Sequence, residues 1–125
     1  MASVGTIGVQ IPANQALSGG IDLGANSLVA IEVPSTWAGG AVITFQAKGA
    51  GINDEESDPE DWNDVYDDAG TEVSVTVASN RVVVIGTVTK AAIGAVRYLR
   101  IRSGTAAAPV NQNPARNLRL LVKGQ

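Results

Sequence analysis

The sequence Ala-Val-Arg-Tyr-Leu-Arg-Ile-Arg-Ser-Gly-Thr-Ala-Ala-Ala-Pro, from Ala95 to Pro109, begins as a strand and ends as a loop of small residues. β-Branched and aromatic residues favour extended backbone in its first half, and Ser103-Gly104 ends the strand. Because side chains alternate along a strand, two mixed sets lie on opposite faces: Val96, Tyr98 and Arg100, and Arg97, Leu99 and Ile101. Both faces combine apolar residues with arginine, so we expect a strand that packs against a core and also presents charge.

Further short stretches rich in strand-forming residues are separated by turns of Gly, Pro, Asn and Asp. Together with the first, they are residues 4–11, 17–24, 28–33, 41–48, 62–66, 72–77, 81–85, 96–102 and 116–123. The connections vary from two residues to more than ten, which favours a jelly roll over an up-and-down barrel. We therefore predict an all-β fold, a jelly-roll-like antiparallel β-sandwich of about eight strands.

Three of these regions carry more specific expectations. Residues 81–85, Arg-Val-Val-Val-Ile, form a continuous apolar run, which is typical of a strand deep in a sheet. Residues 87–95 are compatible with a loop or with a helical turn. Residues 41–48 alternate most clearly, with Ile43, Phe45 and Ala47 expected to face the core and Val42, Thr44, Gln46 and Lys48 expected to face outward.

The length of 125 residues is typical of one domain, and 45% apolar residues suffice for a core. Aromatic residues make up only 4%, so we expect an interior of Val, Ile, Leu and Ala. We assign residues 1–12 to an N-terminal strand or arm and residues 13–125 to a single β-sandwich domain. An arm that adds a strand to a neighbour predicts that removing residues 1–12 weakens attachment to a partner and leaves the fold intact.

The sequence contains neither Cys nor His. This excludes disulfides, thiolate and imidazole metal sites, and Ser-His-Asp or Cys-His catalysis. No phosphate-binding GxxxxGKS/T motif and no dinucleotide-binding GxGxxG motif occurs. A glycosidase needs two opposed carboxylates, whereas the acids outside one loop are only Asp22, Glu32 and Glu72. We predict no enzymatic activity, no catalytic residues, no cofactor and no metal.

The acidic residues are concentrated in one segment, since nine of the twelve lie between Asp54 and Asp68. Four of them alternate like the odd positions of a calcium-binding loop, namely Asp54, Glu56, Asp58 and Glu60. Pro59 stands where that loop needs glycine for its sharp turn, which excludes an EF-hand. A solvated, self-repelling loop is the favoured interpretation, and the binding of another cation by residues 54–68 stays open.

Basic residues are concentrated at the other end of the chain, with six of the nine at or after Arg97 and no acid there. Because arginine pairs well with carboxylates across subunits, we predict an interface formed by Arg97, Arg100, Arg102, Arg116 and Arg119. The net charge of −3 argues against nucleic acid as a partner. Trp37 and Trp62 are candidate stacking residues for sugar rings, although a chain so poor in aromatics usually packs them in its core.

The N-terminal sequence lacks the basic residues and the apolar run of a signal peptide. No apolar run in the sequence is long enough to cross a bilayer as a helix. We therefore expect a chain that is made in the cytoplasm and has no membrane partner.

Three segments carry a resemblance to a known group of proteins. They are Trp-Asn-Asp-Val-Tyr-Asp-Asp-Ala-Gly-Thr-Glu-Val (62–73), Val-Arg-Tyr-Leu-Arg-Ile-Arg-Ser-Gly-Thr-Ala-Ala-Ala-Pro-Val (96–110) and Arg-Asn-Leu-Arg-Leu-Leu-Val (116–122). With residues 21–24 and 41–46, they resemble small virion proteins of tailed bacteriophages and prophages, of the kind encoded near head and tail genes. The resemblance covers most of the chain from about residue 17, and its motifs are structural rather than catalytic.

Within this group the chain is most similar to head decoration, or cement, proteins. The resemblance implies a small all-β homo-oligomer, with a trimer favoured, that is made in the host cytoplasm and binds the head surface of the virion. Its partner there would be the major capsid protein, and its function would be to stabilise the head by binding between capsid subunits. The alternatives are a tail, baseplate or fibre module that binds a host-surface carbohydrate, and a sugar-binding module outside any virion.

Overall fold

The computed structural model describes residues 4–37, 39–48, 62–87, 89, 93 and 96–124. Over these residues the chain forms nine strands in two antiparallel sheets. The strands are β1 (Val4–Ile11), β2 (Ile21–Asp22), β3 (Asn26–Val33), β4 (Val42–Lys48), β5 (Asn63–Asp64), β6 (Ser74–Thr76), β7 (Arg81–Val84), β8 (Tyr98–Ser103) and β9 (Arg116–Gly124). The predicted antiparallel β-sandwich is confirmed.

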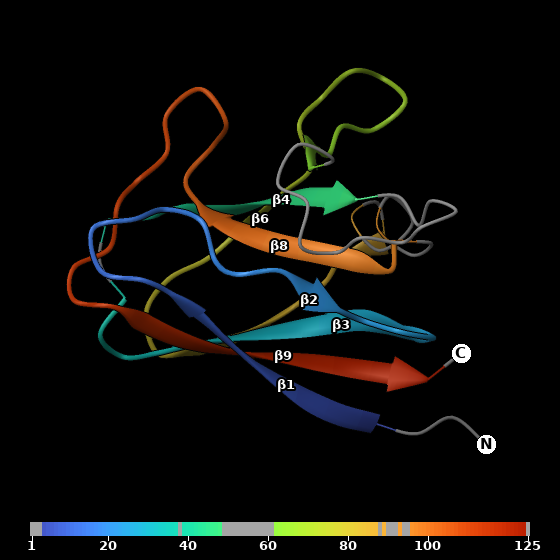
Figure 1. Cartoon of the computed structure of the whole chain (residues 1–125), viewed down its shortest axis with the longest axis horizontal. Coiled ribbons are helices and arrows are strands. Elements are labelled where there is room, and N and C mark those ends of the chain that lie inside the picture. Colours follow the sequence, from blue (N-terminus) through green and yellow to red (C-terminus); the bar gives the residue numbers. More distant parts are fainter. Residues whose placement is uncertain are drawn as a thin grey trace.

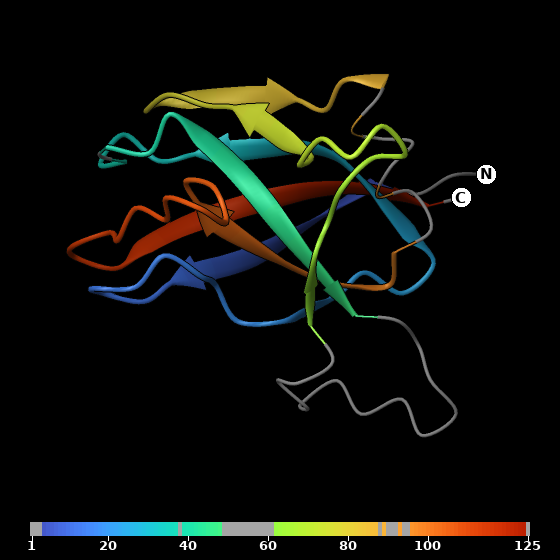
Figure 2. The same ribbon diagram turned by 90° about the horizontal axis from the view of Figure 1, so that it is seen from above.

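The two sheets form the two layers of the sandwich (Figure 1). One sheet has the order β1-β9-β3-β7, and the other has the order β2-β8-β4-β5, with β6 also paired to β4. The chain changes sheet at most connections, and only β4, β5 and β6 follow one another in the same sheet. Figure 2 shows β4 (green) crossing β9 (red) obliquely, as expected for two twisted sheets packed face to face.

The core lies between the sheets and consists mainly of aliphatic side chains. Alternation along each long strand supplies it, so Ile43 and Phe45 of β4 and Leu118 and Leu120 of β9 are buried members of the same core cluster. Phe45 is the only phenylalanine of the chain and is completely buried. The expected interior of Val, Ile and Leu is therefore present, and it holds the two sheets together.

The N-terminal segment is a strand of the chain's own sheet. β1 pairs antiparallel with β9 along its whole length, from Val4 opposite Lys123 to Ile11 opposite Arg116. Val9 and Ile11 are buried in the core. Of the two alternatives, strand or arm, the described residues 4–11 form the strand, so their removal would expose part of the core.

Residues 81–85 were predicted to lie deep in a sheet, and this prediction is wrong for the strand β7, although Ile85 directly after it is buried in the core. β7 is the edge strand of the four-stranded sheet and pairs only with β3 in the described part of the chain. Val82 is 56% exposed and Val84 is 75% exposed. A continuous apolar run is ambiguous because it marks either a strand covered on both faces or a strand with an apolar outer face. In β7 the apolar side chains of the outer face, Val82 and Val84, are exposed to solvent, and we refer to this outer face of the four-stranded sheet as the bare face.

The region after β7 was compatible with a loop or a helical turn. Three of its residues, Thr87, Thr89 and Ile93, have helical backbone, and Ile93 is buried in the core. The remaining residues of 87–95 lie outside the described part of the chain.

Replacing Ile11 by Ala tests whether β1 belongs to the core. We expect the free energy of unfolding to fall by about 2–5 kcal/mol, because the substitution opens a cavity at a fully buried position. Gln10→Ala is the matched control on the outward face of the same strand, and its effect should stay within about 0.5 kcal/mol. Urea denaturation followed by circular dichroism measures both. Equal stability of the two variants would indicate that β1 detaches without loss, as an arm would.

Candidate interaction surfaces

Arg102, a predicted interface residue, lies in a polar network on the outer face of the five-stranded sheet. Its Nη1 is 2.8 Å from Oδ1 of Asp64, and its Nη2 is 2.7 Å from Oε2 of Glu72. Its Nε donates a hydrogen bond to Oγ1 of Thr44, 3.0 Å away on the neighbouring strand. The side chain of Arg102 is only 6% exposed. The guanidinium therefore joins β8 to β4, to β5 and to the segment before β6.

The same network fastens the loop that follows β8. The hydroxyl of Thr44 donates to the carbonyl of Gly104 at 2.7 Å, and the amide of Ala106 donates to Oε2 of Glu72 at 3.1 Å. Gly104 has φ of +87°, and a Cβ there would lie 2.5 Å from the carbonyl oxygen of Ala108. The chain therefore needs glycine at the start of this loop.

Cross-strand register explains why these polar residues meet. Thr44 lies opposite Arg102 and Gln46 lies opposite Arg100 in the β4–β8 ladder, while Gln46 lies opposite Asp64 in the β4–β5 ladder. Hydrogen bonds from Arg102 and then from Gln46 hold the pKa of Asp64 below its usual range. Asp64 is therefore ionised in the folded protein and is engaged by its own chain.

Arg100 lies beside this network and stacks on a tryptophan. Its Nε donates to Oε1 of Gln46 at 2.7 Å, and its guanidinium carbon is 4.7 Å from the ring centroid of Trp62. Burial lowers the pKa of Arg100, and the nearby charge of Arg102 lowers it further. Trp62 is half-buried, and its ring also lies against Gly20, where a Cβ would come within 2.9 Å of it. Arg100 and Trp62 thus support each other and keep part of their surface exposed.

Arg97 forms an ion pair at the edge of the same sheet. Its Nε and Nη2 lie 3.0 and 3.2 Å from the two carboxylate oxygens of Asp22, and its guanidinium carbon is 4.9 Å from the ring centroid of Tyr98. The hydrogen bond from Arg97 lowers the pKa of Asp22. Both side chains are substantially exposed, so the pair contributes little to stability and stays accessible to a partner.

Lys48 is a buried cation that the alternation of β4 did not predict. The residue is 2% exposed, although the pattern placed its side chain outward. Its Nζ lies 5.8 Å from the ring centroid of Tyr98 and has no hydrogen-bond partner among the described residues. An ammonium over an aromatic face is stabilised most when it is shielded from water. Lys48 and Tyr98 are opposite one another in the β4–β8 ladder, which accounts for the contact.

Arg116, the fourth predicted interface residue, also lies inside the chain. It is 6% exposed, and its Nε donates to Oε1 of Gln112 at 3.1 Å while its Nη2 donates to the carbonyl of Asn113. Gln112 in turn donates to Oγ of Ser103 at 2.9 Å. This chain of hydrogen bonds joins the start of β9 to the end of β8. Arg116, like Arg102, has most of its hydrogen-bonding surface occupied within the subunit.

Trp37, one of the two candidate stacking residues, is packed in the core. It is 7% exposed, and its Nε1 donates to the carbonyl of Gly40 at 2.7 Å. Trp62 lies on the outer face of the five-stranded sheet instead. The structure therefore does not bring the two tryptophans together as a platform. Tyr66, which is 53% exposed, is the large aromatic side chain most open to solvent among the described residues.

Arg119 lies on the outer face of the other, four-stranded sheet. Its Nη1 is 3.9 Å from Oε1 of Glu32 on the neighbouring strand, and the two side chains are 68% and 44% exposed. This face also carries Val82 and Val84 of β7 and Val4 of β1, which is 81% exposed. The face thus combines exposed valines at its two edges with a loose ion pair near its centre and with polar residues such as Gln10, Asn117 and Lys123. The hydrophobic pattern of β7 was the sequence signal for the valines of that strand.

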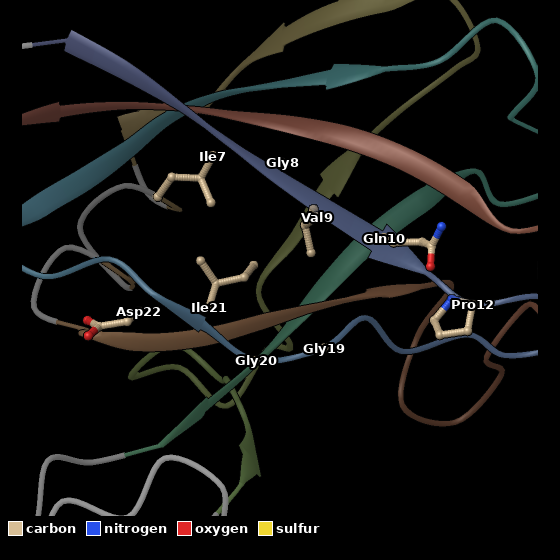
Figure 3. A pocket seen from close by; sticks show the side chains of 9 residues that line it. All are labelled: Ile7, Gly8, Val9, Gln10, Pro12, Gly19, Gly20, Ile21 and Asp22. Carbon is tan, nitrogen blue, oxygen red and sulfur yellow. The ribbon is translucent and has the colours of Figure 1, made fainter.

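An open cleft of about 490 Å³ lies where the edges of the two sheets separate. Its walls are β1 and the segment 19–22 (Figure 3). Ile7 and Val9 point from one wall toward Ile21 on the other, and Gly8, Gly19 and Gly20 add no side chains. Asp22 is the only ionisable residue among those that line it. The cleft is suited to apolar contact.

Most of the acidic loop, residues 49–61, lies outside the described part of the chain. The residues 54–60 that were considered as cation ligands are among those outside it. Of the later acids, Asp67 accepts hydrogen bonds from the amides of Ala69 and Thr71, both at 2.9 Å, and so shapes a turn. In the described residues no three potential metal ligands cluster together. The described residues also include no helix that is long and apolar enough to span a membrane.

Comparison with known proteins identified no relative of this chain, because no family model, no curated protein and no solved structure matched it.

Replacing Arg102 by Met tests the internal network. The methionine replaces the apolar stem of the side chain but is shorter than arginine and carries no charge, so Asp64 and Glu72 lose their cation. We expect the free energy of unfolding to fall by about 3 kcal/mol. Arg119→Ala removes the exposed, loose ion pair with Glu32 and should change the free energy of unfolding by less than about 1 kcal/mol. Urea denaturation measures both variants. A negligible effect of Arg102→Met would mean that this arginine is free for an external partner.

Lowering the pH should reduce the free energy of unfolding, because Asp64 becomes protonated and loses its charge. Since the pKa of this carboxyl is depressed in the folded state, its contribution to stability is complete above the unfolded pKa of about 3.9 and is lost as the pH falls through the lower, folded pKa. The stability difference between the natural protein and Asp64→Asn should therefore be constant from pH 7 to about pH 5 and should shrink below about pH 4. Asp68→Asn removes an exposed carboxylate from a nearby turn and is the control. Urea titrations at successive pH values would contradict the assignment if the two variants behaved alike.

Proposed function

We propose that this chain is a non-enzymatic structural protein of a tailed-phage particle, and within that particle a head decoration (cement) protein. Its place would be the outer surface of the head, between subunits of the major capsid protein, after synthesis in the host cytoplasm. The resemblance of residues 62–73, 96–110 and 116–122 to small virion proteins supports the assignment to a virion. The antiparallel sandwich is compatible with it.

The observation that carries a role in assembly is the outer face of the four-stranded sheet. Val4, Val82 and Val84 are each more than half exposed on this one face. Val82 and Val84 lie on β7 at one edge of this face and Val4 lies on β1 at the other edge, with the ion pair of Arg119 and Glu32 between them. Exposed apolar side chains combined with polar residues are typical of protein-contact surfaces. The face therefore supports a function through protein contact.

The arginines that could reach a capsid subunit are those that keep exposed surface. Arg97 and Arg119 have exposed side chains, and Arg100 is partly open beside Trp62. Arg102 and Arg116 are occupied inside the chain. Arg97 and Arg100 lie at the five-stranded sheet, whereas Arg119 lies on the outer face of the four-stranded sheet. The predicted arginine interface is therefore divided between two separate surfaces, and on each the guanidinium can offer bidentate hydrogen bonds to carboxylates.

A tail, baseplate or fibre module that binds carbohydrate is the second candidate. It is favoured by Trp62 and the exposed Tyr66, since aromatic rings stack on sugars, but Trp37 is buried and cannot contribute. On a glycan array this function requires saturable binding that Trp62→Ala abolishes and that Asp68→Asn leaves unchanged. A sugar-binding module outside any virion would give the same array result, and its absence from particles would distinguish it.

The copy number of the chain in purified particles tests the proposal. Particles induced from the strain that encodes the chain would be analysed by quantitative mass spectrometry against their major capsid protein. We expect a stoichiometry comparable to that of the capsid protein, since a decoration protein covers the head lattice. A few copies per particle would favour the tail or fibre module. Absence from the particle would contradict both virion functions.

A further inference from the structure

The outer face of the four-stranded sheet is arranged in rows that cross all four strands. The strand registers place Thr6, Leu121, Ala30 and Val84 in one row, in the order β1, β9, β3 and β7. The adjacent row, in the same strand order, is Gly8, Arg119, Glu32 and Val82. Each row thus has a small or short residue toward β1 and an exposed valine at β7.

The relief of the face follows from these side chains. Val82 and Val84 stand out from β7, whereas nothing lies within 4 Å of the place where a Cβ of Gly8 would be. Ala30 is low and almost covered, at 6% exposure. An open hollow of about 280 Å³ lies toward β1, lined by Val4, Gly5, Thr6, Val29, Leu121 and Val122. In these two rows the face therefore projects at the β7 edge and is low at the β1 edge, and Val4 projects only at the next row along β1.

We propose that a second copy of this chain packs on this face, related by a two-fold axis that runs parallel to the strands between β9 and β3. This operation reverses the strand order of the partner, so that β7 lies over β1 of the other copy. Val82 then faces the partner's Gly8, and Val84 faces the partner's Thr6 beside the hollow. Each projection meets a depression of the same row, and one operation satisfies both copies, as an isologous interface requires.

The two-fold axis also brings opposite charges of the two copies together. Arg119 comes opposite the partner's Glu32, and Glu32 comes opposite the partner's Arg119. Within one chain these groups are 3.9 Å apart and exposed, so their pairing is incomplete. In the dimer each guanidinium lies between two carboxylates, shielded by the surrounding valines, which strengthens charge pairing and fixes the register. Leu121 meets the partner's Ala30 in the adjacent row and supplies apolar contact.

The size of the face sets the strength of this dimer. Four strands about 4.8 Å apart and about seven residues long cover roughly 19 by 23 Å on each copy. Two such footprints bury on the order of 900 Å², close to the lower limit of about 1,000 Å² for specific interfaces. The dimer is therefore dependent on concentration. A second copy is favoured over an unrelated partner because the projecting and charged side chains of each row match the low and oppositely charged positions of the same row in the other copy. The inference rests on the proposed use of this face in protein contact and not on the location in a virion.

Charge reversal tests the pairing on the purified full chain by sedimentation equilibrium up to about 200 µM, well above a micromolar dissociation constant. The natural protein should approach twice its mass of 12.8 kDa. Glu32→Arg alone places four cations at the centre of the interface, and Arg119→Glu alone places four anions there. Each should weaken self-association at least about tenfold. Asp68→Arg, a change of the same charge far from this face, should not.

Mixing the two single variants separates this dimer from any role of the pair within one chain. Neither variant can form the intrachain pair, yet across the two-fold axis every contact between them joins opposite charges. The mixture should therefore associate as tightly as the natural protein. A natural protein that stays monomeric at about 200 µM, forms a trimer, or gives a mixture no tighter than its components would overturn the proposal. The copy number in particles is measured independently, so failure of the dimer and failure of the virion assignment are distinguishable.

Discussion

The buried guanidinium of Arg102 is the contact on which the arrangement of the five-stranded layer depends. β5 and β6 are short, so the segment 62–77 is held to the sheet by core burial of Val73, Val75 and Val77 and by polar contacts as well as by ladder hydrogen bonds. Asp64 and Glu72 from this segment are both bonded to Arg102, and Glu72 also accepts from the loop after β8. A buried ion pair adds little net stability over an apolar alternative. Loss of one partner is nevertheless costly, because it leaves the other charges unpaired and shielded from water. Its effect here is to fix one arrangement of these segments.

The two outer faces of the sandwich differ because only one of them is covered by the chain itself. On the five-stranded sheet, Thr44, Lys48 and Arg102 point outward and are nevertheless buried. On the four-stranded sheet, the outward residues of β1 and β7 stay exposed, including three valines. On the first face, Thr44 and Arg102 are hydrogen-bonded within the chain and Lys48 lies over the ring of Tyr98. The second retains apolar surface and an incomplete ion pair, and it is the part of the molecule best suited to a partner.

The difference between the two faces assigns separate structural roles to the arginines near the C-terminal end. Five of them formed one predicted interface, yet Arg102 and Arg116 stabilise the subunit, Arg100 supports Trp62, and Arg97 pairs with Asp22. Only Arg119 lies on the bare face, beside Glu32. A decoration protein that binds between capsid subunits and a two-fold pair of sandwiches both need such a face, because each requires contact without a chemical site.

The sequence by itself determined the all-β class, most strand positions and the inward side chains Ile43 and Phe45 of β4, because alternation is a local property that follows from strand geometry. It also determined the lack of Cys and His chemistry. Tertiary structure alone decided which sheet faces are covered. β7 became an edge strand rather than a central one, and Lys48, Arg102 and Arg116 became buried rather than exposed. These outcomes depend on pairing between residues far apart in the chain, such as Arg102 with Asp64 and Glu72, and no local pattern encodes which distant segment will cover a face.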